Sequence, residues 1–169
     1  MNLHFYIDRL AQSAAVISSL VQGVSPDQSR WKPAPDRWSV LEVINHLDDE
    51  ERDDFRKRLD FLLHKPDQSP PPIDPPRWAV ERKYNERELQ ESLERFLKER
   101  RSSLQWLHGL RNPHWEQVFQ LPHGPIRAGD ILASWAAHDL LHIRQLTRLQ
   151  YEYLSRESTP YLTEYAGCW

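Results

Sequence analysis

The sequence has one cysteine, five glycines and no long uncharged apolar run, and each shortage excludes a class of protein. Cys168 has no second cysteine to pair with, so the chain forms no internal disulfide, and a lone thiol is typical of the reducing cytosol. No segment approaches the roughly 18 consecutive apolar residues of a membrane helix. The N-terminal residues lack the basic and apolar regions of a signal peptide. We therefore expect a soluble, cytoplasmic protein with no membrane partner.

A strong charge of one sign is also missing. The chain carries 22 Lys and Arg against 25 Asp and Glu, for a net charge of −3. The basic residues are spread among the acidic ones rather than gathered in a stripe, and a stripe is what binding to a phosphate backbone requires. We therefore expect no nucleic-acid partner.

Alternation of apolar and polar residues, the pattern of strands, is absent, whereas four long segments have apolar residues at helical spacing. We predict helices over residues 3–22, 39–64, 86–110 and 130–154. Ser39 and Glu42 form a capping box at the start of the second helix, and Asn85 is the predicted N-cap of the third. Residues 65–77 hold six prolines, which favour an extended connection. The pattern predicts one all-α domain over residues 1–169, a four-helix bundle with long crossover connections.

The fourth predicted helix contains the stretch WAAHDLLHIRQ (residues 135–145), in which two histidines stand four residues apart. They belong to an unbroken seam of alternating four- and three-residue spacing: Ile131, Trp135, His138, His142, Gln145 and Leu149. Both histidines therefore face the bundle interior, where a polar side chain needs a partner. Two imidazoles at this spacing can bind one metal ion. They can equally be hydrogen-bonded core residues, because such pairs are common by chance.

The second predicted helix supplies a third histidine, His46, at or beside its inward face. If the second and fourth helices are neighbours, His46 can meet His138 and His142, and three imidazoles leave a coordination position open to water or substrate. Glu50 lies one turn beyond His46 and is a candidate catalytic residue. It can be a base, a fourth ligand or an acceptor that orients a histidine, or simply a solvated member of the acidic run 48–54.

Other polar residues have alternative interpretations. Gln145 can hydrogen-bond a substrate or make a structural contact inside the bundle. Asp139 points about 100° away from His138 around the helix, so it braces another helix or faces water. Trp38 and Trp135 are candidates to shield a metal pocket, and His123 to approach it from a loop. Three arginines offer a local positive cluster for an anionic cofactor: Arg37, Arg144 and Arg148.

Two segments, RWSVLEVINHLDDEE (residues 37–51) and SWAAHDLLHIRQL (residues 134–146), resemble the DinB-like superfamily of metalloenzymes. There, a Trp-Ser pair opens a helix with a His-Leu dipeptide and acidic residues, and a later helix carries the pattern His-Asp-x-x-His-x-x-Gln. The resemblance implies an up-and-down-like bundle in which His46, His138 and His142 hold a divalent metal, often zinc or nickel. It also implies a homodimer. Some relatives are thiol S-transferases or isomerases that use a low-molecular-weight thiol.

Three functional hypotheses follow. In the first, the protein is a metal-dependent enzyme acting on a small-molecule substrate, by thiol transfer or by hydrolysis, which the sequence does not separate. In the second, it is a non-catalytic, metal-binding dimeric bundle with a stress-related or binding role. In the third, the histidines hold no metal. The open position left by three histidines favours catalysis, whereas closure of the shell by Glu50 would favour the second hypothesis.

Overall fold

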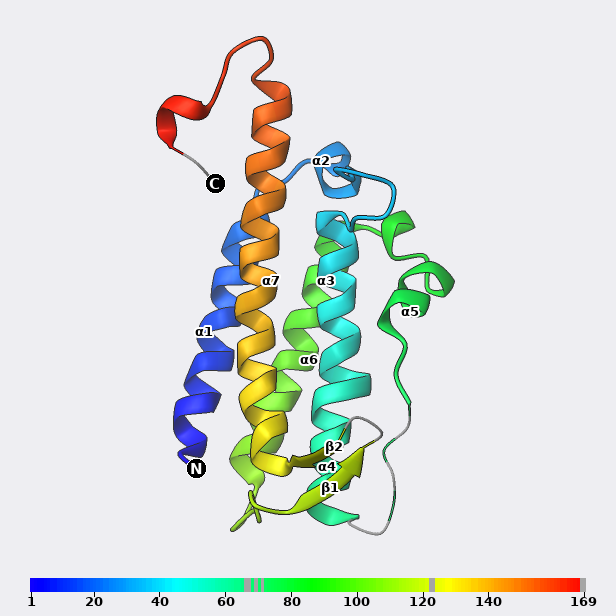
Figure 1. Ribbon diagram of the computed structural model, residues 1–169, viewed down its shortest axis with the longest axis vertical. Helices are drawn as coiled ribbons and strands as arrows, with labels where there is room; N and C mark the ends of the chain where they lie inside the picture. The colour runs from blue at the N-terminus through cyan, green and yellow to red at the C-terminus, as the bar shows by residue number, and fades with distance from the viewer. Residues whose placement is uncertain (66–67, 69, 71, 122–123, 168–169) are drawn as a thin grey trace.

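The computed structural model describes residues 1–65, 68, 70, 72–121 and 124–167. Four long helices lie side by side (Figure 1): α1 (Leu3–Val21), α3 continued by α4 (Val40–Asp49 and Arg56–His64), α6 (Leu89–Gly109) and α7 (Ala128–Glu157). In this view α1 and α7 run upward, whereas α3–α4 and α6 run downward. Both α1 and α3 contact α6 and α7. The predicted all-α four-helix bundle is confirmed, with the helix directions up, down, down, up rather than strictly alternating.

The interior consists of two apolar clusters separated by a polar layer. One cluster is centred on Leu10, Leu59 and Trp135, and the other on Ile17, Ile44 and Phe96. Burying each such side chain contributes roughly 1.5–3 kcal/mol to folding. Between the clusters lie buried polar and charged side chains from three of the long helices: His46, Glu50, Glu51, Arg100 and Asp139. This layer is where the sequence-predicted histidines are found.

The second long helix begins as predicted and then departs from α-helical geometry. The Ser39 hydroxyl accepts from the Glu42 backbone N–H, and the Glu42 carboxylate accepts from that of Ser39, at 3.1 and 2.8 Å. The helix continues to His64, but its middle part, Glu50–Phe55, is π-helical. A π turn accommodates an extra residue and rotates everything after it relative to the preceding helix, and such turns are frequent at functional sites.

The connections hold elements that the pattern did not predict. An antiparallel hairpin of β1 (Val118–Leu121) and β2 (Gly124–Arg127) precedes α7, where no strand was expected, because four-residue strands are too short to display an alternating pattern. Short helices α2 (Pro26–Arg30) and α5 (Pro75–Glu81) lie in the first and second connections. α5 begins inside the proline-rich segment, since prolines are tolerated in a first helical turn.

The predicted start of the third helix was wrong. α6 begins at Leu89 with Glu88 as its N-cap, and Asn85 lies in a preceding 3₁₀ turn. The Asn85 side chain accepts from the Ser39 hydroxyl at 2.6 Å and donates to the Arg30 carbonyl at 3.1 Å. Asn85 thus connects three segments instead of capping one.

Within the described residues, no helix has the length and apolar character needed to cross a membrane. His123 and Cys168, weighed in the sequence, lie outside the described residues.

Candidate metal centre

His46, His138 and His142 come together in the polar layer. His46 projects from α3, and the other two project from the neighbouring antiparallel helix α7. The Nε2 atom of His138 lies 3.2 Å from Nε2 of His46 and 3.0 Å from Nε2 of His142. All three possible ligand atoms lie within 4.8 Å of one another. The meeting of the three side chains expected from the sequence is therefore observed.

The outer nitrogens of two rings face hydrogen-bond acceptors. Nδ1 of His142 lies 2.8 Å from Oε1 of Gln145, so Nδ1 carries the proton and the Nε2 lone pair points inward. Nδ1 of His46 lies 3.6 Å from Oε1 of Glu50, slightly beyond hydrogen-bond length, and neither atom has another partner in the described structure. Of the two interpretations of Gln145, the structural contact is observed, and its partner is His142.

Burial keeps the imidazoles neutral. It lowers the pKa of His46 to about 2, helped by His142 and His138, and the pKa of His138 to about 3, helped by His142 and the Arg100 guanidinium. Burial also lowers the pKa of His142, against the opposing effect of its bond to Gln145. Neutral imidazole is the form of histidine that binds metal, and here three neutral rings direct a nitrogen at one point.

Aromatic rings wall the cluster. The Trp38 ring lies 4.8 Å from that of His46, and the Phe55 ring lies 5.0 Å from that of His138. Phe55 also stacks on Trp135 at 5.8 Å. Phe55 was missed in the sequence because it follows the seven charged residues 48–54, and the π turn brings its side chain into the core.

Glu50 is buried, with 4% of its surface exposed, so the interpretation as a solvated residue is wrong. Burial raises its pKa to about 9, with the charge of Asp54 and a hydrogen bond to Asp54 adding to the effect and Arg58 opposing it. The carboxyl group therefore keeps its proton at neutral pH in the metal-free protein. The three converging ligand atoms do not include a Glu50 oxygen.

A buried charge network lies directly beneath the histidines. Arg100 of α6 donates to both carboxylate oxygens of Asp139, at 2.6 and 2.8 Å, and approaches Glu51 Oε1 at 2.6 Å. Trp135 Nε1 also donates to Glu51 Oε1, at 2.7 Å. Asp139 therefore braces another helix, one of its two expected roles. Arg100 and Glu51 were missed because an arginine and a glutamate on charged helices carry no sign of burial in the sequence.

A cavity of about 600 Å³ opens beside the cluster, and the sequence-noted arginines Arg37, Arg144 and Arg148 line it together with His142 and Gln145. Arg37 Nη1 and Arg148 Nε share one Glu152 oxygen, at 3.0 and 2.8 Å. Arg144 forms no ion pair within the described part of the chain and stays available to an anion. The cavity is large enough for a small molecule.

The comparisons agree with this architecture. The sequence profile of the DinB superfamily matches residues 9–146. Among solved structures the chain is similar to YfiT from Bacillus subtilis, described as a probable metal-dependent hydrolase with an unusual four-helix bundle topology. The two chains share 19% sequence identity with a TM-score of 0.78, over 89% of this chain and 87% of YfiT, a likeness that supports the fold. None of the curated proteins matches.

Proposed function

Because the chain belongs to the DinB superfamily and brings three neutral imidazoles to one point, we propose that it is a metal-dependent hydrolase of small molecules. His46, His138 and His142 would hold the divalent metal, zinc or nickel. The convergence of the three side chains is the observation that carries the proposal. When bound, the metal supplies Lewis acidity, which acidifies water or a thiol and polarises a substrate carbonyl or phosphoryl group.

The spacing of the histidines fits such an ion. Two imidazole nitrogens bound to one tetrahedral zinc, each at about 2.0–2.1 Å, lie roughly 3.3 Å apart. The two Nε2 separations of 3.2 and 3.0 Å are close to that value. Without a metal, only one of the two Nε2 contacts can be a hydrogen bond, because Nε2 of His142 carries no proton and Nε2 of His138 either donates or accepts. The donor set therefore fits a transition metal better than a hydrogen-bonded core.

The surrounding residues have distinct roles in this proposal. Gln145 fixes the tautomer of His142 by accepting from Nδ1. Glu50 faces Nδ1 of His46 at 3.6 Å, and a small approach of the two groups on metal binding would make it an orienting acceptor rather than a ligand. Trp38 and Phe55 keep bulk water from the rings. Because Glu50 stands outside the group of converging atoms, a position stays open for substrate, which favours catalysis over a closed structural site.

Thiol transfer is the second candidate. The arginine-lined cavity beside His142 supports it, because guanidinium groups would hold the acidic groups of an anionic low-molecular-weight thiol. The same arginines would also hold an anionic hydrolase substrate, so activity assays have to separate the two reactions.

The first experiment is elemental analysis of protein purified without added metal. We expect near-stoichiometric zinc or nickel in the parent, and its loss in His138→Ala and His142→Ala variants. His64→Ala, which removes an exposed histidine at the end of α4, is the matched control and should retain the metal. An absence of bound metal, together with no rise in the unfolding temperature on adding zinc or nickel, would reject the proposal.

Catalysis needs its own test. Esterase, amidase and thiol-transfer substrates are offered to the metal-loaded parent and to a folded His46→Ala variant. Hydrolysis lost in the variant supports the hydrolase, and thiol transfer alone supports the second candidate. No turnover in the parent in any assay would leave a metal-binding protein without this activity.

A further inference from the structure

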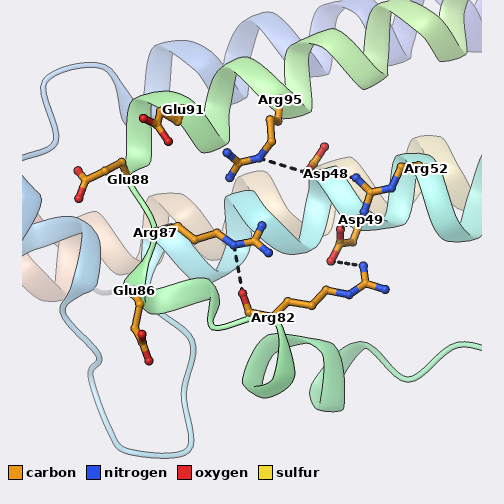
Figure 2. A pocket seen from close by; sticks show the side chains of 9 residues that line it. All are labelled: Asp48, Asp49, Arg52, Arg82, Glu86, Arg87, Glu88, Glu91 and Arg95. Carbon is orange, nitrogen blue, oxygen red and sulfur yellow. Dashed lines mark hydrogen bonds and ion pairs between the residues drawn. The ribbon is translucent and has the colours of Figure 1, made fainter.

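A second charged cleft lies on the other side of α3 from the histidines. Asp48 follows His46 by two residues, which turns it about 200° around the helix. The cleft has a volume of about 600 Å³ and lies between α3, the start of α6 and the turn after α5 (Figure 2). Arg82 and Arg87 enter it from that turn, and Arg95 enters it from α6.

In the described structure Arg87 has no carboxylate partner, and Arg95 has only a distant one, Asp48. Arg87 Nη1 and Arg95 Nη2 both donate to Oδ1 of Asn45, at 2.7 and 3.1 Å, so two guanidinium groups converge on one neutral amide oxygen. The carboxylate nearest to Arg95 is that of Asp48, 3.7 Å from Nε. Arg87 has no ion pair to a carboxylate anywhere in the described chain. Guanidinium pairs of this kind bind carboxylates and phosphates through paired N–H donors.

The other half of the cleft is already neutralised. Arg82 Nη1 lies 2.6 Å from Asp49 and 3.0 Å from Asp53, and Arg52 Nη2 lies 2.5 Å from Asp49 and 3.1 Å from Asp53. These four side chains form a closed network that needs no ligand. Among the described arginines of the cleft, those without a carboxylate at hydrogen-bond distance are therefore Arg87 and Arg95.

Asp48 presents the opposite deficit. It is 1% exposed, and its Oδ1 atom accepts no hydrogen bond in the described structure. Its other oxygen lies 3.7 and 3.8 Å from the guanidinium nitrogens of Arg95 and Arg52, too far for hydrogen bonds. In Figure 2 Asp48 points from α3 toward Arg95. Leaving a buried carboxylate oxygen without a hydrogen-bond donor costs folding free energy. A ligand in the cleft that carries a donor would remove this cost.

We propose that this cleft binds a free α-amino acid. Its carboxylate would lie against Arg87 and Arg95, and its ammonium group would donate to Asp48. An amino acid carries both groups on one carbon and so meets both deficits at once. An inorganic anion would meet only the first deficit, and the interior of a peptide carries neither charge. This site is separate from the histidine cluster and does not depend on the metal.

The thermal unfolding midpoint of the metal-free protein is measured with each of the twenty free L-amino acids at about 5 mM. We expect at least one of them to raise it. The best one is then compared by calorimetry with its N-acetyl and amide derivatives. Because each derivative removes one charge-assisted contact, each should bind about ten- to hundredfold more weakly. If no amino acid raises the midpoint, or if the N-acetyl derivative or phosphate binds as tightly as the parent, the proposal is overturned.

Variants locate the site. Asp48→Asn keeps the shape of the side chain, and Arg95→Gln changes a residue near the cleft surface. Each variant should weaken amino-acid binding about tenfold or more. Arg101→Gln and Asp36→Asn, both exposed and outside the cleft, should leave it unchanged. Unchanged binding in both cleft variants would contradict the assignment. Loading the protein with zinc should not alter its affinity for the amino acid. A failure of amino-acid binding can therefore be told apart from a failure of metal binding at the histidines.

Discussion

Arg100→Met is the sharpest test of how the candidate centre is held together. Arg100 is 1% exposed, and its guanidinium group contacts two other helices and the π segment. It donates to the Leu10 carbonyl of α1 at 2.7 Å, forms a two-point pair with Asp139 of α7, and approaches Glu51 at 2.6 Å. Methionine preserves most of the buried length and removes the charge. Two buried carboxylates then face each other without a cation.

Breaking a buried ion pair by removing one partner costs about 3–5 kcal/mol. A domain of this kind has a free energy of unfolding of about 5–15 kcal/mol, so the substitution removes a large part of it. With a urea m-value of about 2 kcal/mol per molar, the unfolding midpoint should fall by roughly 2 M. The loss should be smaller in an Arg100→Met, Glu51→Gln, Asp139→Asn triple variant, because no uncompensated charge is left buried.

The assay is urea unfolding of the metal-free protein, with circular dichroism as the signal that reports unfolding. Arg101→Met is the matched control, because Arg101 is the next residue of α6 and is exposed. A loss below about 1 kcal/mol in Arg100→Met, or an equal loss in the control, would refute the reasoning that this cation stabilises the polar layer.

Three further predictions follow from the site and the fold. Burial keeps His46 and His138 unprotonated down to a pKa of about 2 and about 3, while the unfolded chain takes up protons below about pH 6.5. The free energy of unfolding of the metal-free protein should therefore fall as the pH falls, by about 1 kcal/mol per histidine between about pH 6 and pH 5. In urea titrations, the His138→Phe variant should show a smaller fall over the same pH range. Gln145→Leu should weaken zinc binding about 10- to 100-fold in a chelator competition, whereas Gln105→Leu, on the exposed face of α6, should not change it. Ser39→Ala should lower the free energy of unfolding by about 1 kcal/mol through loss of the capping box; an unchanged urea midpoint would contradict that assignment.

The features predicted correctly from the sequence are those that depend on local spacing. Helical periodicity located the four long helices, and the four-three seam turned His138 and His142 inward. The capping box marked the start of α3 because its two partners are three residues apart. The sequence could place His46 beside His138 and His142 only if its helix packs against the fourth helix. In the structure α3 does contact α7.

The acidic run 48–54 could not be understood from local pattern. Its charges are typical of a solvated helix face, yet Asp48, Asp49, Glu50 and Glu51 are all buried. Some of their partners lie 33 to 84 positions away in the chain, as with Arg82 at Asp49 and Trp135 at Glu51. The π turn adds to the difficulty, because no residue in it is a recognised signal for such geometry. Burial of charge is decided here by tertiary partners and not by composition.

The position of the buried charges explains why a bundle would keep a costly polar layer. Asp139 directly follows His138 in α7, so a side chain that fixes Asp139 also fixes the height and rotation of that helix. Arg100 fixes it from α6 and at the same time holds Glu51, five residues after His46 on the other histidine-bearing helix. One guanidinium group thus fixes the position of α7 relative to the helix formed by α3 and the π segment. A shift of one helical residue, about 1.5 Å along the axis, would separate imidazole nitrogens that now lie 3.0 to 3.2 Å apart. An apolar layer would be free of the desolvation cost, but it would lack the directional contacts that hold this register.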